Sequence, residues 1–181
     1  MILAFDPDSK NIGVAWGPAG QLAGVDVIRI PKGESLHQQV GRAVLSWLQS
    51  IAAVLPLDDV CTVVVEGQRI RPRSAARPND ILLLGQVAGV LVGALESRLD
   101  ARLVVPAPEE WKGQQPKTVN QARSYTALGW TYQIQGSKSS GYCIPISGHR
   151  DIYCPTYLRP ADWKHVGDAV GMALWGGRAT A

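Results

Sequence analysis

The chain has 181 residues, of which 46% are hydrophobic and 18% are charged, and its formal net charge is +3. This composition excludes an intrinsically disordered protein, because disorder requires low hydrophobicity and a high net charge. The small net charge excludes a polycationic tail but leaves room for a local basic surface. The length suits one globular domain over residues 1–181.

The expected compartment follows from three further features. No uninterrupted apolar run reaches the roughly 18 residues of a membrane span. The N-terminus lacks the basic region of a secretory signal. The three cysteines are too few and too unevenly spaced for a disulfide framework. We therefore expect a reduced, cytoplasmic protein that does not contact a membrane.

The spacing of apolar residues predicts a mixed α/β fold. Three short apolar runs at the start are separated by tight turns, which favours an antiparallel meander. In chain order the pattern predicts strands over 1–5, 12–16 and 22–30, a helix over 36–55, a strand over 61–65, a helix over 80–98, a strand over 102–105 and helices over 118–128 and 162–175. These elements predict a mixed five-stranded sheet with helices on both faces.

Glycines mark two of the predicted helices. Gly85, Gly89 and Gly93 lie on one stripe of the second helix. Because each glycine costs about 1 kcal/mol in a helix interior, the stripe favours close packing against a sheet or a second helix. Gly176 and Gly177 follow the last predicted helix and are expected to end it.

Residues 130–160 are rich in Gly, Ser, Tyr and Pro and show no sustained period, so we expect an irregular insert there. A hairpin around Gly148 and His149 is one structure that the insert can take. Cys143, His149 and Cys154 are also candidate zinc ligands. Their spacings match no common zinc finger and no fourth ligand is evident, so zinc is the weaker interpretation.

Two acidic residues follow predicted buried strands. Asp6 ends the first strand and Glu66 follows the fourth. In open α/β sheets, ligands bind outside the carboxyl ends of strands, so both are candidate site residues. Alternation along the first strand puts Asp8 on the same face as Asp6 if the strand continues. The plainer alternative is that Asp6 starts an Asp-Pro turn and Glu66 caps a strand end.

His165 and Asp168 stand three residues apart on one flank of the last predicted helix. Either they face water, or a helix that is apolar nearly all round presents them to a site. Together with Asp6 and Glu66 they make three carboxylates and one imidazole, which suits Mg²⁺ or Mn²⁺. Two such ions can hold the attacking water and the leaving oxygen of a phosphodiester in line.

Five motifs, in this order and spacing, resemble the RuvC-type Holliday junction resolvases of the RNase H-like superfamily, in particular their phage-borne relatives. The resemblance covers nearly the whole chain apart from 130–160. The segments that carry it are ILAFDPDSKNIGVAW, VVVEGQ, DILLLGQVAGVLVGAL, PAPEEWKGQQPK and HVGDAVGMAL. The family usually has Gly where this chain has Asp8, which weakens the match of the first turn without touching the candidate ligands.

The resemblance implies an RNase H-like fold and a metal-dependent endonuclease that resolves or nicks branched DNA, leaving a 5′-phosphate and a 3′-hydroxyl. It implies two Mg²⁺ ions per active site, which Mn²⁺ can replace, and a homodimer formed through the helix over 79–98. The implied catalytic and metal-binding residues are Asp6, Glu66, His165 and Asp168. Here His165 is either a ligand or the group that orients the water.

Basic residues are the expected DNA contacts. The resemblance assigns phosphate contact to Lys112 and Lys117. The four arginines that follow Glu66 within a few residues, Arg69, Arg71, Arg73 and Arg77, form either a solvated loop or an approach for DNA phosphates. Given the resemblance, we favour the interpretation that these arginines lead DNA phosphates to the site, although the family often has a stacking aromatic residue in this loop. Trp111 is expected to be a packing residue more than a platform for a base.

Two other functions remain open at this stage. An actin- or sugar-kinase-like ATPase has a similar phosphate loop after its first strand, but 181 residues leave no room for its second half-domain. A non-catalytic DNA-binding relative would keep the fold and lose the metals. The presence of all four acid or His positions counts against this second alternative.

Overall fold

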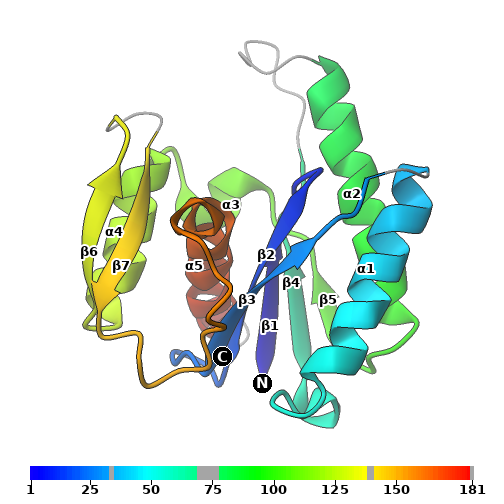
Figure 1. The fold of residues 1–181 in the computed structure, drawn as a ribbon, viewed down its shortest axis with the longest axis horizontal. Coiled ribbons are helices and arrows are strands. Elements are labelled where there is room, and N and C mark those ends of the chain that lie inside the picture. The colour runs from blue at the N-terminus through cyan, green and yellow to red at the C-terminus, as the bar shows by residue number, and fades with distance from the viewer. Residues whose placement is uncertain (33–34, 69–77, 138–140, 180–181) are drawn as a thin grey trace.

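A five-stranded mixed sheet forms the centre of the molecule (Figure 1). The computed structural model describes residues 1–32, 35–68, 78–137 and 141–179. The strands are β1 (Ile2–Asp6), β2 (Asn11–Gly17), β3 (Gly24–Arg29), β4 (Thr62–Val65) and β5 (Arg102–Val104), in the order β3-β2-β1-β4-β5. β1, β2 and β3 form the antiparallel meander, and β4 and β5 run parallel to β1. The predicted fold class is confirmed.

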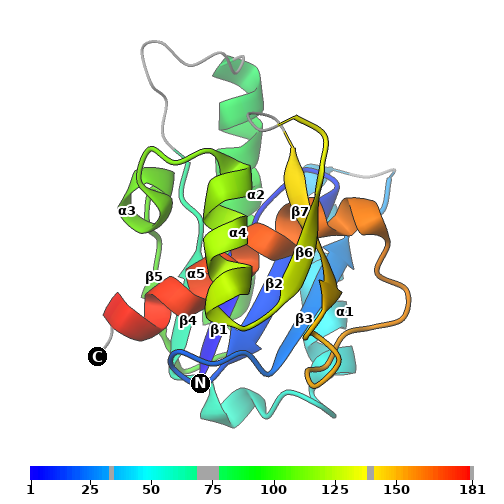
Figure 2. The same ribbon diagram turned by 90° about the vertical axis from the view of Figure 1, so that its left-hand side faces the viewer.

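Helices cover both faces of this sheet. The remaining elements are α1 (Leu36–Ile51), η1 (Leu57–Asp59), α2 (Pro78–Glu96), α3 (Pro108–Lys112), α4 (Lys117–Ala127), β6 (Thr131–Gln135), β7 (Tyr142–Ser147), η2 (Pro160–Asp162) and α5 (Trp163–Ala179). α1 and α2 lie on one face and α5 crosses the other (Figure 1). α4 and the β6–β7 hairpin form a further layer outside α5 (Figure 2).

Strand alternation divides the hydrophobic core between the two faces of the sheet. On β1, Leu3 and Phe5 are buried among the residues of α1 and α2, whereas Ile2 and Ala4 are buried among those of α5. This is the side-chain period of two that an extended strand imposes. The sequence pattern therefore predicts correctly that Asp6 shares a face with Ile2 and Ala4, which is the face that α5 covers.

Glycines let α5 lie unusually close to the sheet. A Cβ atom on Gly13 of β2 would overlap the backbone of His165, and one on Gly176 would lie 2.9 Å from Cγ2 of Val64. The expectation that Gly176 and Gly177 end the last helix is wrong, since α5 continues to Ala179. Gly176 and Gly177 instead let α5 lie close to the rest of the chain, because a side chain at either position would overlap neighbouring atoms.

An ion pair holds the start of α5 on β3. The buried carboxylate of Asp162 accepts hydrogen bonds from Nη2 of Arg29 at 2.9 Å and from the backbone N–H of Arg159 at 2.8 Å. Burial alone raises the pKa of Asp162, but these hydrogen bonds outweigh burial and bring the pKa below its ordinary value. The position of α5 along the sheet is therefore fixed by charge as well as by packing.

The 130–160 segment contains a hairpin, but its turn is not where the sequence suggests. β6 pairs antiparallel with β7, so the turn lies between Gln135 and Tyr142, and Gly136 begins it with a φ of 86°. Gly148 instead follows β7, where a Cβ atom would lie 2.8 Å from the ring of Trp130. The hairpin expected around Gly148 and His149 is wrong because this glycine makes room for a tryptophan rather than for a hairpin turn.

α2 buries one side and leaves the other bare. Val87, Leu91 and Leu95 pack in the core shared with α1. The expected contact for the Gly85 stripe is not found in this chain: Cβ atoms on Gly85, Gly89 or Gly93 would meet nothing within 4 Å among the described residues. By length and composition α2 is also the one described helix able to cross a membrane, with a mean hydropathy of 1.4 over 79–96.

Gly13→Ala tests the close approach of α5. We expect a loss of about 1–3 kcal/mol in the free energy of unfolding, because the added methyl group must displace the α5 backbone. Gly41→Ala in α1 is the control, since its Cβ would lie at an ordinary 3.8 Å from Val90 and alanine favours a helix. Urea unfolding measures both; an unchanged Gly13→Ala protein would contradict the account.

Candidate active site

Asp6 and Glu66 lie side by side at one end of the sheet. β1 and β4 are parallel neighbours in which Phe5 pairs with Val65, so their carboxyl ends coincide. The ladder extends one residue further, because the Glu66 N–H donates to the Phe5 carbonyl at 3.1 Å. Asp6 and Glu66 are 5% and 6% exposed. Both are therefore buried at the position where α/β sheets bind ligands.

His165 reaches Asp6 because α5 is seated on Gly13. Asp6 and Gly13 are partners across the β1–β2 ladder, and the His165 backbone lies directly over Gly13. His165 Nδ1 is 3.0 Å from Oδ2 of Asp6, and its Nε2 is 3.9 Å from Oδ2 of Asp8. The site therefore includes Asp8, which the alternation of β1 indicates but which was not among the predicted site residues.

Asp168 lies about one turn further along α5 and is 2% exposed. The structure thus decides between the two interpretations of this helix, since neither Asp168 nor His165 faces open water. Oδ2 of Asp168 pairs with the Lys117 ammonium group at 2.5 Å. Its other oxygen, Oδ1, accepts a hydrogen bond from Nε2 of Gln121 at 2.9 Å. Gln121 is a site residue that the sequence analysis missed.

Two lysines lie among the carboxylates. Lys112 Nζ is 2.9 Å from Oε1 of Glu66 and 4.0 Å from Oδ2 of Asp168, and Lys117 pairs with Asp168. Burial alone lowers the pKa values of both lysines, but the nearby carboxylates outweigh burial and raise them. Both ammonium groups are therefore charged and lie inside the site, and the phosphate contact that the resemblance implies for them stays a prediction.

Trp111 contacts the site directly. It belongs to α3, a five-residue helix with proline at its first position that the sequence pattern did not predict. The Trp111 indole N–H donates to Oε1 of Glu66 at 3.1 Å, and Nζ of Lys112 lies 4.7 Å from the indole ring centroid. Trp111 is buried, as expected of a packing residue. It also orients a candidate metal-binding carboxylate, which its sequence context does not reveal.

The carboxylates have different acidities. Burial raises the pKa of Asp6, but the hydrogen bond from His165 and the charges of Lys117 and Lys112 outweigh it and bring the pKa below its usual value. Burial and the charge of Asp6 raise the pKa of Glu66 to about 7, against the opposing charge of Lys112. Like charges at one place thus produce one strong and one weak acid.

The donor set suits a hard divalent cation. Asp6, Glu66 and Asp168 offer carboxylate oxygens and His165 offers an imidazole nitrogen, which are ligands that Mg²⁺ and Mn²⁺ accept. Within the described residues, however, no three His, Cys, Asp or Glu side chains lie close enough to hold an ion as they stand. The lysines occupy carboxylate oxygens that a cation would need, so binding requires the ion pairs to rearrange.

The other candidates lie elsewhere. Arg69, Arg71, Arg73 and Arg77 are outside the residues that the structure describes. For the zinc alternative, the Cys143 thiol donates to the Thr118 carbonyl at 3.4 Å. His149 packs by its ring on Trp130 and Trp163. Cys143, His149 and Cys154 are therefore not grouped as metal ligands in the described part of the chain.

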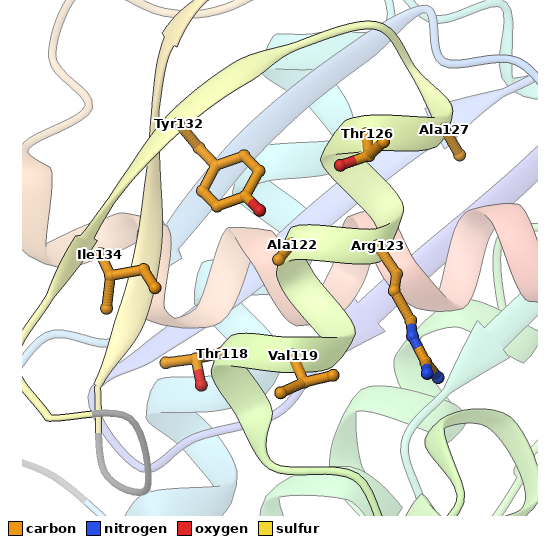
Figure 3. Close-up of a pocket in the computed structure, with 8 residues that line it drawn as sticks. All are labelled: Thr118, Val119, Ala122, Arg123, Thr126, Ala127, Tyr132 and Ile134. Carbon is orange, nitrogen blue, oxygen red and sulfur yellow. The ribbon is translucent and has the colours of Figure 1, made fainter.

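A separate apolar groove of about 620 Å³ lies between α4 and β6 (Figure 3). Tyr132 and Ile134 line one side of it, and α4 residues line the other. None of its eight lining residues belongs to the cluster of acids and lysines. The groove is therefore distinct from the candidate active site.

Comparison with solved structures identifies the fold. Thermus thermophilus RuvC in complex with a Holliday junction substrate aligns with a TM-score of 0.57 and 17% identity, over 99% of this chain and 94% of that chain. A second Thermus thermophilus RuvC structure gives 0.55 and 16%, over 99% and 95%. No protein-family model and no curated protein matches the sequence. The chain has the RNase H-like fold of RuvC.

Glu66→Gln tests the electrostatics of the metal-free site. Because the folded pKa of Glu66 is about 7 and its ordinary value is 4.5, the folded state holds a proton that the unfolded state releases between these values. Stability therefore falls as pH rises from 5 to 8, by on the order of 3 kcal/mol. Urea unfolding in the presence of a chelator measures this fall.

Glu66→Gln removes this titration, so the variant is expected to lack the fall. The exposed Glu96→Gln is the control and keeps the wild-type profile. A Glu66→Gln protein that loses as much stability as the wild type between pH 5 and pH 8 would show that titration of Glu66 does not cause the fall.

Proposed function

We propose that this protein is a metal-dependent endonuclease that resolves or nicks branched DNA, such as Holliday junctions. The observation that carries the proposal is that Asp6, Glu66, Asp168 and His165 gather at the carboxyl ends of β1 and β4, where His165 contacts Asp6 and Lys112 lies between Glu66 and Asp168. The RuvC fold supports it, because a structural neighbour was solved with a Holliday junction substrate. The sequence motifs and the site geometry thus point to the same chemistry.

In this proposal Asp6, Glu66 and Asp168 would hold two Mg²⁺ or Mn²⁺ ions. These ions would activate water and stabilise the leaving oxygen of a phosphodiester. His165 receives its orientation from Asp6 at Nδ1, which leaves Nε2 to bind an ion or to exchange a proton with water. Oδ2 of Asp8 lies 3.9 Å from this same nitrogen.

The basic residues divide into two groups in this proposal. Lys112 and Lys117 would place positive charge beside the scissile phosphate, since the carboxylates already hold both ammonium groups at the site. The arginines Arg69, Arg71, Arg73 and Arg77 follow Glu66 directly in the sequence, and they would lead the DNA backbone to it. Base identity plays no part in such contacts, which suits recognition of DNA by its branch.

We also propose a homodimer formed through α2. The side chain of Leu82 is 55% exposed, and the Gly85, Gly89 and Gly93 stripe beside it is bare. Such an apolar helix face marks an interaction site, and glycines allow a second helix to approach closely. A twofold dimer buries the same face of both chains at once. The alternative occupant of this face, a lipid bilayer, rests on the composition of one helix.

The reduced, cytoplasmic setting is part of the same proposal. All three cysteines are free, and Cys143 is buried beside Thr118. An enzyme whose substrate is DNA also belongs in the compartment that holds DNA. The non-catalytic alternative has less support, because a protein that had lost the metals would gain nothing from burying three carboxylates together.

Asp6→Asn tests the activity. We expect the wild-type protein with Mg²⁺ or Mn²⁺ to cut a synthetic four-way junction in preference to a linear duplex, and to leave 5′-phosphate ends. Asp6→Asn should be slower by about a hundredfold or more, because it removes a ligand charge. The exposed Asp58→Asn is the control. A wild type that cuts neither substrate contradicts the proposal, and one that hydrolyses ATP instead favours the kinase-like alternative.

Leu82→Lys tests the dimer. Light scattering of the wild-type protein should give twice the 19.5 kDa chain mass. The variant should give a single chain, because a charge at this face opposes apolar contact. The matched control is Val54→Lys, which places the same charge at a residue that is 47% exposed elsewhere. A monomeric wild type that co-sediments with lipid vesicles would assign the face to a membrane instead.

A further inference from the structure

Gln121 joins the active site to the β6–β7 hairpin. Its side chain is 0% exposed, and both ends of its amide are bonded. Nε2 donates to Oδ1 of Asp168 at 2.9 Å and to the Lys164 carbonyl at 3.2 Å. Oε1 accepts the backbone N–H of Cys143 in β7 at 2.8 Å. Gln121 of α4 is thus the polar link between α5 and the hairpin.

These partners allow only one orientation of the amide. A reversed amide would turn Oε1 toward the Asp168 carboxylate and Nε2 toward the Cys143 N–H, which sets two acceptors and two donors against each other. Because Oδ1 of Asp168 is bound to Gln121, Oδ2 is the oxygen that faces Lys117 and Lys112. Gln121 therefore decides which oxygen of Asp168 is presented to the cluster.

A glycine on α5 makes room for the hydrogen bond between Gln121 and Asp168. A Cβ atom on Gly167, the residue before Asp168, would lie 2.8 Å from Nε2 of Gln121 and 2.7 Å from the hydroxyl of Tyr125. Only glycine leaves room there for both side chains. A glycine of α5 thus stands where Gln121 reaches the carboxylate.

The hairpin supports Gln121 from the other side. Besides the Cys143 N–H bond, the Cys143 carbonyl accepts a bond from the Tyr125 hydroxyl at 3.5 Å, and its thiol donates to the Thr118 carbonyl at 3.4 Å. Three groups of Cys143 therefore bind three residues of α4. This fixes the hairpin on α4 and buries the Gln121 amide away from water, where a hydrogen bond to a charged group is strong.

We propose that Gln121, supported by the β6–β7 hairpin, is the positioning residue of Asp168. This inference rests on the proposed function and goes further by assigning the 130–160 segment a part in metal binding. A carboxylate held at one oxygen offers the other in a fixed direction, so less freedom is lost when a cation binds. Hydrogen-bond partners of this kind change metal affinity by about 10- to 100-fold.

Gln121→Met and Gln121→Asn test the proposal. Methionine has a similar length and cannot donate, and asparagine keeps the amide but is one methylene too short. Ser124→Ala is the matched control, because it removes a hydrogen bond within α4, to the Asn120 carbonyl, that involves neither Gln121 nor Cys143. Calorimetric titration with Mn²⁺ measures affinity, urea unfolding measures stability, and junction cleavage is followed against Mg²⁺ concentration.

We expect both Gln121 variants to bind Mn²⁺ about 10-fold more weakly or worse, and to need correspondingly more Mg²⁺ for half-maximal cleavage. Ser124→Ala should stay within about twofold of the wild type. Equal Mn²⁺ affinity in the wild type and the Gln121 variants overturns the positioning role and leaves the nuclease proposal standing. An equal loss in Ser124→Ala also overturns it, because general loosening of α4 then explains the effect. A wild type that binds no Mn²⁺ overturns both proposals.

Discussion

The arrangement of the site depends on how closely α5 lies against β1 and β2. Gly13 leaves no side chain between β2 and the α5 backbone at His165, and Gly13 is the ladder partner of Asp6. A helix seated there carries His165 to Asp6 and, about one turn later, Asp168 to the same end of the sheet. The absence of a side chain at Gly13 thus lets Asp6 and His165 meet, although they lie far apart in the sequence.

Burial of three carboxylates at one place is the second constraint. The charges that compensate for it come from elements that contribute no carboxylate to the cluster. α3 and α4 supply Lys112 and Lys117, whose ammonium groups pair with Glu66 and Asp168. Without them the like charges would repel in a region with little water. α3 and α4 are therefore part of the site, although each of the three acids lies on or beside the sheet or on α5.

The sequence predicts the five strands of the sheet and four of the five α-helices, because each of these segments carries its apolar pattern over enough residues to be recognised. It misses α3, which has only five residues, and the β6–β7 strands, where β6 is largely exposed and carries few apolar residues. Asp6 and Glu66 can be located because strand ends are local features. Trp111 and Gln121 cannot, since their partners are fixed only by tertiary packing.

The charges at the site bear on the proposed binding of a cation and of DNA. With all groups ionised, three carboxylates against two lysines leave a net charge of −1, to which Asp8 adds a further partial share near His165. A negative, buried site would attract a divalent cation, and one such ion would change the net charge to +1. In the proposed function, Lys112 and Lys117 would then leave Glu66 and Asp168 and face a phosphate. The lysines that pair with these carboxylates in the fold would thus supply the positive charge that contact with a DNA backbone requires.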